Sequence, residues 1–209
     1  MGLDQFRKEY QKDSLNESTL KKDPWVQFTE WFDEACASDI LEPNSMCLST
    51  VNASLKPSSR IVLLKEIKKE GFVFFSNYQS RKAKDLEENP NACLNFLWKE
   101  LERQVRIEGL VQKISEEEST KYFNSRPRGS MIGSFISPQS QVIPNRELLV
   151  KKFQELENSL DAISKPEHWG GYILIPDYFE FWQGRPNRLH DRFRYTKLEN
   201  VWQPDRLAP

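Results

Sequence analysis

Hydrophobic residues recur along the chain at two different spacings, the first of which predicts a single helix. After Asp23 and Pro24, apolar residues return every three or four positions, as on one face of an α-helix: Trp25, Phe28, Trp31, Phe32 and Cys36. Asp23 is suited to the N-cap and Pro24 to the first helical position. The pattern predicts an amphipathic helix from residue 24 to about residue 38.

Beyond this helix the spacing changes to the alternation that is typical of strands. Segments rich in β-branched and aromatic residues, separated by turn-sized gaps, cover residues 46–52, 59–66, 71–76, 92–98 and 104–114. In the last of these, Val105, Ile107 and Val111 alternate with polar residues, so one face is expected to be buried. Four further strands are predicted at residues 170–175, 178–183, 192–196 and 201–206.

Three more helices are predicted between the strands. Ser80 is a candidate N-cap for a helix that reaches about Asn89, where Pro90 follows. Ser115 and Glu118 have the spacing of a capping box and predict a helix to Ser125. A helix after Asn145 carries an apolar stripe that is expected to pack on the core: Leu148, Leu149, Phe153, Leu156 and Leu160.

The chain is expected to fold as one domain spanning residues 1–209. About eight short strands with a few inserted helices favour a mainly β, α+β fold, an antiparallel barrel or sandwich, over alternating βαβ units. Residues 1–20 are polar and too poor in apolar side chains to repay the entropy of ordering by themselves. They are predicted to form a mobile N-terminal arm.

Charge and cysteine content exclude several classes of protein. The 30 Lys and Arg residues nearly balance the 31 Asp and Glu residues, so no global field attracts nucleic acid or an anionic membrane. No apolar run is long enough to span a membrane. Three cysteines without CxxC spacing predict reduced thiols and no cysteine zinc site. We therefore expect a cytoplasmic protein whose partners are small molecules.

Two groups of cations are candidates for anion binding. Arg81 and Lys82 begin the helix after Ser80, where the helix dipole disfavours cations unless an anion binds there. A solvated surface helix explains them equally well. Arg60 and Lys65 end an apolar strand on opposite faces, and packing does not readily explain either of them. Simple solvation of strand ends remains the plainer interpretation for this pair.

Two further groups combine cations with other polar residues. Tyr122, Arg126 and Ser130 are a usual set of donors for a phosphate monoester, although Arg126 is equally explained by the negative end of a helix. Arg188 and His190 are two positions apart, so in an extended segment they would face one ligand. His190 is open to interpretation as a base, a metal ligand or a structural histidine. No metal site is expected, because the chain has only two histidines and no accompanying carboxylate spacing.

Longer motifs resemble the pyridoxamine/pyridoxine 5'-phosphate oxidases. The matching segments are RIVLLK at 60–65, SRK at 80–82, ERQV at 102–105, YFNSRPRGS at 122–130, QS at 139–140, FWQG at 181–184, RLHDRF at 188–193 and DRLAP at 205–209. The resemblance runs from about Asp4 to Pro209. It implies an antiparallel split β-barrel of Greek-key type, with FMN at the subunit interface of a homodimer.

The resemblance also implies roles for individual residues. Those expected to contact FMN are Arg60, Ile61, Val62, Leu63, Leu64, Lys65, Phe75, Ser76, Arg81, Lys82, Gln104, Gln139, Ser140, Trp182 and Arg192. The substrate phosphate is assigned to Lys65, Tyr122, Arg126 and Ser130, and the pyridine ring to Arg188, Leu189 and His190. Arg188 and His190 are the expected catalytic residues. Arg7 and Tyr10 of the arm are expected to close over bound substrate as a lid.

The implied reaction oxidises pyridoxamine 5'-phosphate or pyridoxine 5'-phosphate to pyridoxal 5'-phosphate. A hydride would pass from the substrate C4' to the flavin N5, and O2 would reoxidise the flavin and form H2O2. The alternative is a flavin-binding split barrel that acts as a carrier or sensor. That protein would need Arg60, Lys82 and Trp182 but not the motifs at 122–130 and 188–193, and both motifs are present. The turn Ala53-Ser54-Leu55 departs from the family, which usually has a glycine there.

Overall fold

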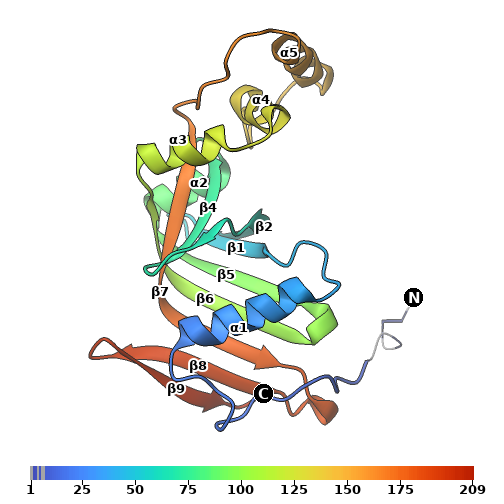
Figure 1. Ribbon diagram of the computed structural model, residues 1–209, viewed down its shortest axis with the longest axis vertical. Helices are drawn as coiled ribbons and strands as arrows, with labels where there is room; N and C mark the ends of the chain where they lie inside the picture. The colour runs from blue at the N-terminus through green and yellow to red at the C-terminus, as the bar shows by residue number, and fades with distance from the viewer. Residues whose placement is uncertain (1, 4, 6–7) are drawn as a thin grey trace.

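A computed structural model describes residues 2–3, 5 and 8–209, and within them the strands form one nine-stranded antiparallel sheet (Figure 1). The strands are β1 (Ser45–Val51), β2 (Pro57–Leu63), β3 (Glu66–Ile67), β4 (Phe72–Asn77), β5 (Asn91–Trp98), β6 (Arg103–Lys113), β7 (Trp169–Gln183), β8 (Asp191–Leu198) and β9 (Val201–Leu207). The helices are α1 (Pro24–Ala37), α2 (Arg81–Glu88), α3 (Glu116–Asn124), α4 (Arg128–Ile136) and α5 (Glu147–Glu157), with short 3-10 turns η1 (Lys99–Leu101) and η2 (Pro186–Arg188). The predicted mainly β, split-barrel architecture is confirmed.

Strand β7 joins two parts of the sheet, because its neighbouring strands change along its length. Its one edge pairs with β6, while its other edge pairs first with β4 and then with β8, which carries β9. The two predicted strands at 170–175 and 178–183 are one strand, because the register shift at Asp177 is a β-bulge rather than a turn. A side-chain carbon on Gly109 would lie 2.0 Å from the Ile175 carbonyl oxygen, so this bulge requires glycine on the facing strand.

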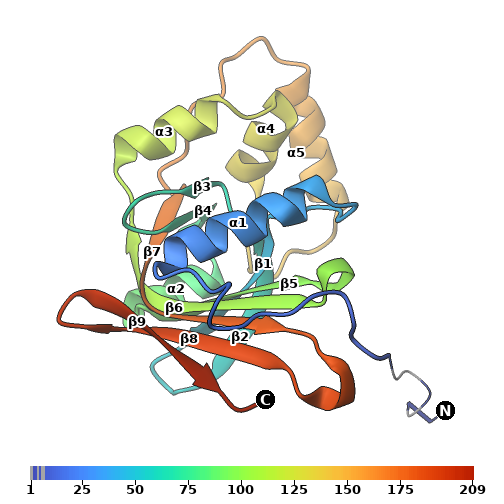
Figure 2. The same cartoon turned by 60° about the horizontal axis from the view of Figure 1, so that its bottom comes forward.

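Helix α1 covers one face of the sheet and closes the core, as its sequence pattern predicts (Figure 2). Asp23 caps it by accepting a hydrogen bond from the Trp25 backbone N–H. The Phe28 ring lies 4.9 Å from that of Phe72, and the Trp31 ring lies 5.4 Å from that of Phe181. These edge-to-face aromatic contacts join the helix to strands β4 and β7.

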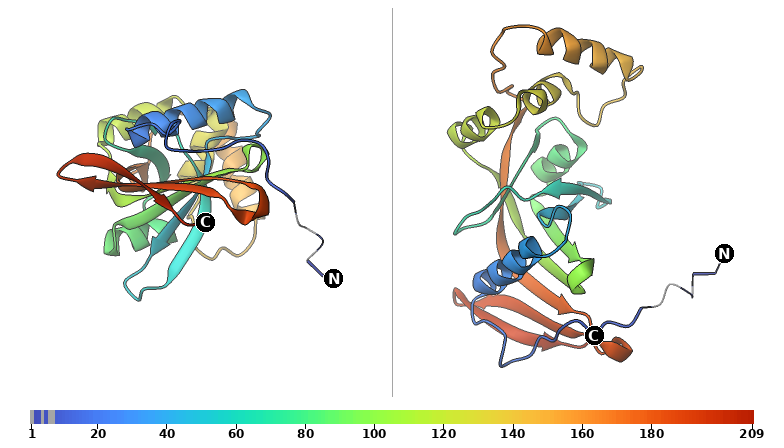
Figure 3. Two further views of the ribbon diagram at one scale, coloured as in Figure 1. Left: turned by 90° about the horizontal axis from the view of Figure 1, so that it is seen from below. Right: turned by 45° about the vertical axis from the view of Figure 1, so that its right-hand side comes forward.

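Helices α3, α4 and α5 lie beyond the end of the sheet opposite to β8 and β9 (Figure 3), and the last two differ from the prediction. Helix α3 has the expected Ser115–Glu118 capping box. Helix α4 was not predicted, because Pro127 was expected only to end the preceding helix, whereas it stands at the N-cap of α4. Helix α5 forms, but its predicted packing on the core is wrong, since none of its residues is buried. It rests on α4 instead, where Arg128 donates hydrogen bonds to the carbonyl oxygens of Leu156, in the last turn of α5, and of Ser159 and Asp161 beyond it.

Two local features complete the fold. In the turn between β1 and β2, Leu55 adopts a left-handed backbone with φ 58°, the conformation that glycine would take without strain. The helices that the structure describes include none with the length and apolar character required to cross a lipid bilayer.

Candidate active site

A pocket of about 1010 Å³ lies between β2, the end of β4, the start of α2, and the α3–α4 region. Most residues that the sequence assigned to a cofactor or a phosphate line it: Arg60, Ile61, Val62, Leu63, Lys65, Phe75, Ser76, Arg81, Lys82, Tyr122, Arg126, Ser130, Gln139 and Ser140. They come from segments far apart in the chain. The fold therefore brings three of the predicted anion-binding groups into one place.

Lys82 is the electrostatic centre of this pocket. Its side chain donates hydrogen bonds to Ser76 Oγ at 3.0 Å, Ser80 Oγ at 3.2 Å and Gln139 Oε1 at 2.9 Å. The residue is only 8% exposed, so a solvated surface position is wrong for it. Burial, with a further contribution from the charge of Arg60, lowers the pKa of Lys82 to about 8. Its acceptors are neutral, so an anion would be a favourable additional partner.

Ser80 and Arg60 have different surroundings from those expected. Ser80 occupies the N-cap position of α2 but makes no capping hydrogen bond, because its hydroxyl accepts from Lys82 instead. Arg60 donates to the Leu48 carbonyl oxygen at 3.1 Å and Thr50 Oγ1 at 2.8 Å, and it lies 3.8 Å from Asp85 Oδ2. Burial lowers the pKa of Arg60. Packing therefore does account for this guanidinium, contrary to the interpretation from sequence.

An aromatic wall with hydrogen-bond donors forms one side of the pocket. The Tyr122 and Phe75 rings stack at 3.9 Å, and Phe75 stacks on Trp169 at 5.3 Å. The Arg126 guanidinium lies 4.7 Å from the Trp169 ring centroid and donates to Ser134 Oγ at 2.8 Å. Burial raises the pKa of Tyr122, so its hydroxyl remains a donor at neutral pH. Such a wall suits a planar ring that carries a phosphate.

A second cluster of predicted cofactor and catalytic residues lies outside the large pocket. Gln104, Trp182 and Arg192 form one row across β6, β7 and β8, because Trp182 is directly opposite both of the others in register. The Trp182 ring lies 5.6 Å from Tyr10 and 4.6 Å from His190. This places the arm residue Tyr10 beside both a predicted cofactor residue and a predicted catalytic residue.

Arg192 is held by a buried carboxylate that sequence reasoning missed. Glu180 Oε1 accepts from Arg192 Nε at 3.0 Å and Nη2 at 2.8 Å, while Oε2 accepts from Arg106 at 2.8 Å. The Glu180 side chain is 4% exposed. The available signal was an acidic residue within an otherwise apolar strand, where an unpaired carboxylate would be costly.

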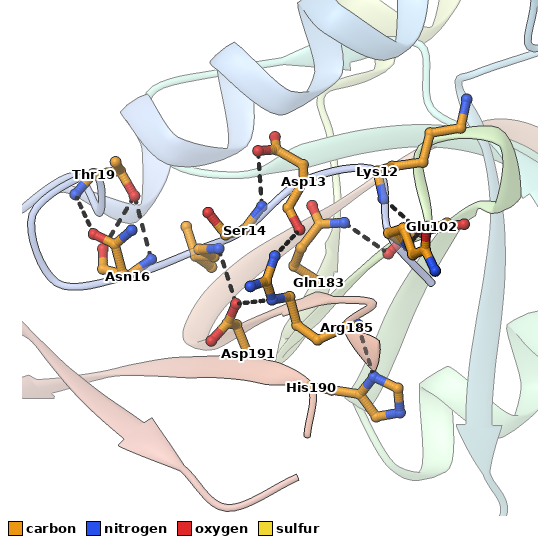
Figure 4. A network of polar contacts seen from close by, with 12 residues as sticks. Lys12, Asp13, Ser14, Asn16, Thr19, Glu102, Gln183, Arg185, His190 and Asp191 are labelled. Carbon is orange, nitrogen blue, oxygen red and sulfur yellow. Dashed lines mark hydrogen bonds and ion pairs between the residues drawn. The ribbon is translucent and has the colours of Figure 1, made fainter. Parts of the chain in front are cut away.

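The segment that carries Arg188 and His190 is not extended. Asn187 and Arg188 have left-handed backbones with φ 57° and 61°, so the argument that alternate residues face one ligand is wrong. His190 Nδ1 accepts a hydrogen bond from the Arg185 backbone N–H at 3.1 Å, which leaves Nε2 for the proton of a neutral ring (Figure 4). Burial and the charge of Arg188 lower the pKa of His190. Arg188 and Leu189 are exposed.

Within the part of the chain that the structure describes, the two clusters line different pockets. Trp169 of the large pocket and Trp182 of the second cluster lie at opposite ends of β7, which corresponds to roughly 40 Å of extended strand. Leu64 is the one β2-region residue of the prediction that lies in the core, where its backbone pairs with Asn44. Arg7 lies outside the described residues.

Comparisons with known proteins point to one family. A family model described as pyridoxamine 5'-phosphate oxidase matches residues 32–159, and one described as the pyridoxine 5'-phosphate oxidase C-terminal dimerisation region matches residues 169–209. The chain is 52% identical to a pyridoxine/pyridoxamine 5'-phosphate oxidase of Rippkaea orientalis, with all of both chains covered.

Solved structures give the same fold. PhzG from Burkholderia lata, determined in complex with tetrahydrophenazine-1-carboxylic acid, superposes with a TM-score of 0.89 at 29% identity, covering 94% of this chain and 98% of that one. An FMN-binding protein from Nostoc punctiforme related to pyridoxamine 5'-phosphate oxidase superposes with a TM-score of 0.73 at 16% identity, covering 91% of this chain and 100% of that one.

Proposed function

The chain belongs to the pyridoxamine 5'-phosphate oxidase family, and from that premise we propose that it oxidises pyridoxamine 5'-phosphate and pyridoxine 5'-phosphate to pyridoxal 5'-phosphate. The observation that carries the proposal is the large pocket, where the buried Lys82 ammonium and the Tyr122–Arg126 wall lie together. These are two separate sets of anion donors, as a phosphorylated cofactor and a phosphorylated substrate require.

The residues present fit FMN. A buried ammonium with neutral acceptors gains a charge-assisted hydrogen bond when the flavin phosphate binds, and Arg81 lines the same pocket. We assign the cofactor to Lys82, Arg81, Ser76, Gln139 and Ser140, with the backbone and side chains of residues 60–65 beside it. Bound FMN supplies the acceptor for the substrate hydride and the reaction with O2 that releases H2O2.

The protein's own groups orient the substrate. Lys65, Tyr122, Arg126 and Ser130 are proposed to hold its phosphate, with Tyr122 donating because its raised pKa keeps the hydroxyl protonated. Arg188 and His190 are proposed to hold the pyridine ring, beside Leu189. Fixing the ring in this way aligns the substrate C4' for transfer, which is where the protein lowers the barrier.

We also propose that each site is completed by a second copy of the chain. The row Gln104–Trp182–Arg192 lies outside the pocket that Lys82 lines, with Gln104 and Trp182 lining a different pocket of the same chain. A symmetric dimer resolves this, because it places equivalent surfaces of two copies opposite each other. The match of residues 169–209 to a dimerisation region supports the same arrangement.

The cytoplasm is the compartment we propose for this reaction. Cys36, Cys47 and Cys93 are all free thiols. Burial raises the pKa of Cys93 to about 11, so this thiol stays protonated and unreactive at neutral pH. Free thiols suit a reducing environment.

The test is oxidation assayed on the purified protein. Flavin absorbance bands, followed by stoichiometric pyridoxal 5'-phosphate and H2O2 after addition of pyridoxamine 5'-phosphate in air, are expected. Tetrahydrophenazine-1-carboxylic acid serves as the competing substrate, because the PhzG structure holds it. A flavin that is reduced by the carboxylic acid and not by either phosphorylated substrate would overturn the proposal, and so would a bound flavin that none of them reduces.

A further inference from the structure

We propose that Glu102 is a positioning residue that holds the N-terminal arm with Tyr10 over Trp182 and His190, and that Gly184 provides the space for Tyr10. The inference rests on the proposed function, in that Trp182 and His190 are taken as cofactor and substrate residues. It assigns to Glu102 and Gly184 a role that the sequence motifs did not reveal. The two residues act through the arm and do not touch substrate.

The Glu102 carboxylate accepts hydrogen bonds from the backbone of the arm. Its Oε2 accepts hydrogen bonds from the backbone N–H groups of Gln11 at 2.7 Å and Lys12 at 3.0 Å (Figure 4). Lys8 Nζ lies 3.4 Å from the other carboxylate oxygen. The Glu102 side chain is 2% exposed, so the carboxylate is committed to these partners rather than to water. Two charge-assisted bonds to consecutive backbone groups fix the path of the chain just after Tyr10.

Gly184 makes room for the ring of Tyr10. A side-chain carbon on Gly184 would lie 2.7 Å from Tyr10 Cγ and 2.8 Å from its Cβ. The same residue donates its backbone N–H to the Glu102 carbonyl oxygen at 2.7 Å, so the glycine and the carboxylate belong to one unit. The close contact of Gly184 with Tyr10 is a separate observation from the hydrogen bonds of the Glu102 carboxylate, and both fix the same position of Tyr10. Tyr10 packs against Gly184, and the neighbouring Glu102 carboxylate holds the N-terminal arm in this position.

Beyond Glu102's contacts, the arm makes further contacts with the rest of the chain. Asp13 pairs with Arg103 at 2.6 Å, and its carbonyl oxygen accepts from Arg185 at 2.8 Å. Further along, the Leu15 backbone N–H donates to Asp191 Oδ2 at 3.1 Å. Glu102 therefore contacts the arm at Gln11 and Lys12, between Tyr10 and this anchored stretch.

The seat of Tyr10 borders a pocket of about 530 Å³ that Lys8, Glu102, Gln104 and Trp182 also line. A tyrosine held there covers the ring substituents of a substrate beside His190 and keeps water away from them. Releasing the arm should weaken substrate binding and slow turnover, while the contacts assigned to the flavin phosphate, in the other pocket, stay intact.

The first test measures the arm itself in the FMN-loaded protein. Glu102→Gln removes the charge and preserves the shape, Gly184→Ala displaces Tyr10, and Glu100→Gln, at an exposed position two residues earlier, is the matched control. Cleavage after Lys8 and Lys12 by a lysine-specific protease is expected to accelerate about tenfold in both variants and not in the control. Wild-type cleavage rates in both variants would overturn the proposal.

The second test uses kinetics to separate positioning from folding. For both variants we expect KM for pyridoxamine 5'-phosphate to rise about tenfold, with a smaller loss of FMN affinity, because only the contact of Tyr10 with Trp182 changes at the cofactor. In a Tyr10→Ala background, Glu102→Gln should add little, because both changes remove the same seated tyrosine. Full additivity would contradict the role assigned to Glu102. If the wild-type protein oxidises neither substrate, the proposed function fails, and the cleavage test still decides whether Glu102 holds the arm.

Discussion

At the scale of single residues, the character of the large pocket rests on one lysine. Lys82 is buried against hydroxyl and amide oxygens and has no carboxylate among its hydrogen-bond acceptors, whereas Arg60 in the same pocket already lies near Asp85. Removing Arg60 would also disturb Asp85, so it confuses loss of an anion partner with loss of a structural contact. Lys82 therefore provides the cleaner probe of cofactor binding.

We expect Lys82→Met to weaken FMN binding about ten- to a hundredfold, because a phosphate dianion loses a charge-assisted partner worth about 1.5 to 3 kcal/mol. Titration of apo-protein with FMN, followed by the quenching of flavin fluorescence, measures the change. Lys84→Met is the control, since Lys84 lies on the same helix but is exposed. Equal affinity in the Lys82 variant and the control would remove Lys82 from the cofactor site.

The same lysine predicts a pH dependence of FMN binding. Its pKa in the free pocket is about 8, below the ordinary value for lysine, and a bound phosphate dianion would raise it. Binding must then take up a proton once the free lysine deprotonates, so FMN affinity should be level up to about pH 7, about half as high at pH 8, and fall by up to about tenfold per pH unit above that. Titrations in the Lys82→Met variant should show no such fall, and a fall of the same size there would assign it to another group.

Arg188 is the residue expected to matter most for turnover outside the cofactor site. Its exposed guanidinium lies next to His190 in a left-handed turn, and its planar donors would hold the pyridine ring in one orientation. Arg188→Lys retains the charge but should slow flavin reduction about a hundredfold at unchanged FMN affinity, as expected for a shift of the substrate by about 1 Å. Anaerobic stopped-flow reduction measures this step. A wild-type rate and substrate affinity would leave Arg188 as a surface cation.

At the scale of elements, the sequence predicts what local interactions decide. Helix α1 and the capping box of α3 follow from residues within a few positions of each other, and both are present. The β7 bulge and helix α4 depend on distant contacts or on a proline that serves as an N-cap instead of a stop. The stripe on α5 has the right period, but periodicity does not identify the surface that a helix will contact.

The close approach at the β7 bulge predicts that Gly109→Ala destabilises the protein, and Gly129→Ala is a control that is expected to have the opposite effect. Gly109→Ala should lower the free energy of unfolding by about 1 to 3 kcal/mol, because the added carbon would overlap the Ile175 carbonyl oxygen. Gly129→Ala in α4 should instead raise it by up to about 1 kcal/mol, because the new carbon meets only Phe153 Cζ at 3.6 Å and alanine favours helix. Urea denaturation of the apo-proteins compares the two, and equal effects would mean that the close approach at Gly109 does not limit stability.

At the scale of the whole molecule, the motifs supplied the candidate residues of the site but not how they are distributed. Each motif is a local string, so it could be assigned a ligand without any knowledge of distance. Only the register of β6, β7 and β8 shows that Gln104, Trp182 and Arg192 form a separate row. Glu102 and Gly184 stand in two of these motifs, but their contact with the arm could not be predicted, since Tyr10 lies about 90 positions or more away along the chain.

A site shared between two subunits predicts that two defective chains can restore each other. We expect a heterodimer of one Lys82→Met chain and one Arg192→Met chain, purified through two different affinity tags, to have about half of the wild-type activity. One of its sites then combines wild-type Lys82 with wild-type Arg192, and the other lacks both. Glu180 keeps Arg106 as a partner in the second variant, so its carboxylate is not left unpaired.

The reciprocal heterodimer must give the opposite result. When one chain carries both substitutions and its partner is wild-type, every shared site lacks one of the two groups, and activity should be close to that of the single-variant homodimers. If Lys82 and Arg192 of the same chain served one site, this heterodimer would keep half of the activity and the first would be nearly inactive. If Lys82 and Arg192 of different chains form one site, the first heterodimer is active and the reciprocal one is nearly inactive. If they belong to the same chain, the two heterodimers exchange these activities. Because each purified heterodimer holds the same two substitutions in total, any general loss of stability affects both alike and leaves the comparison decisive.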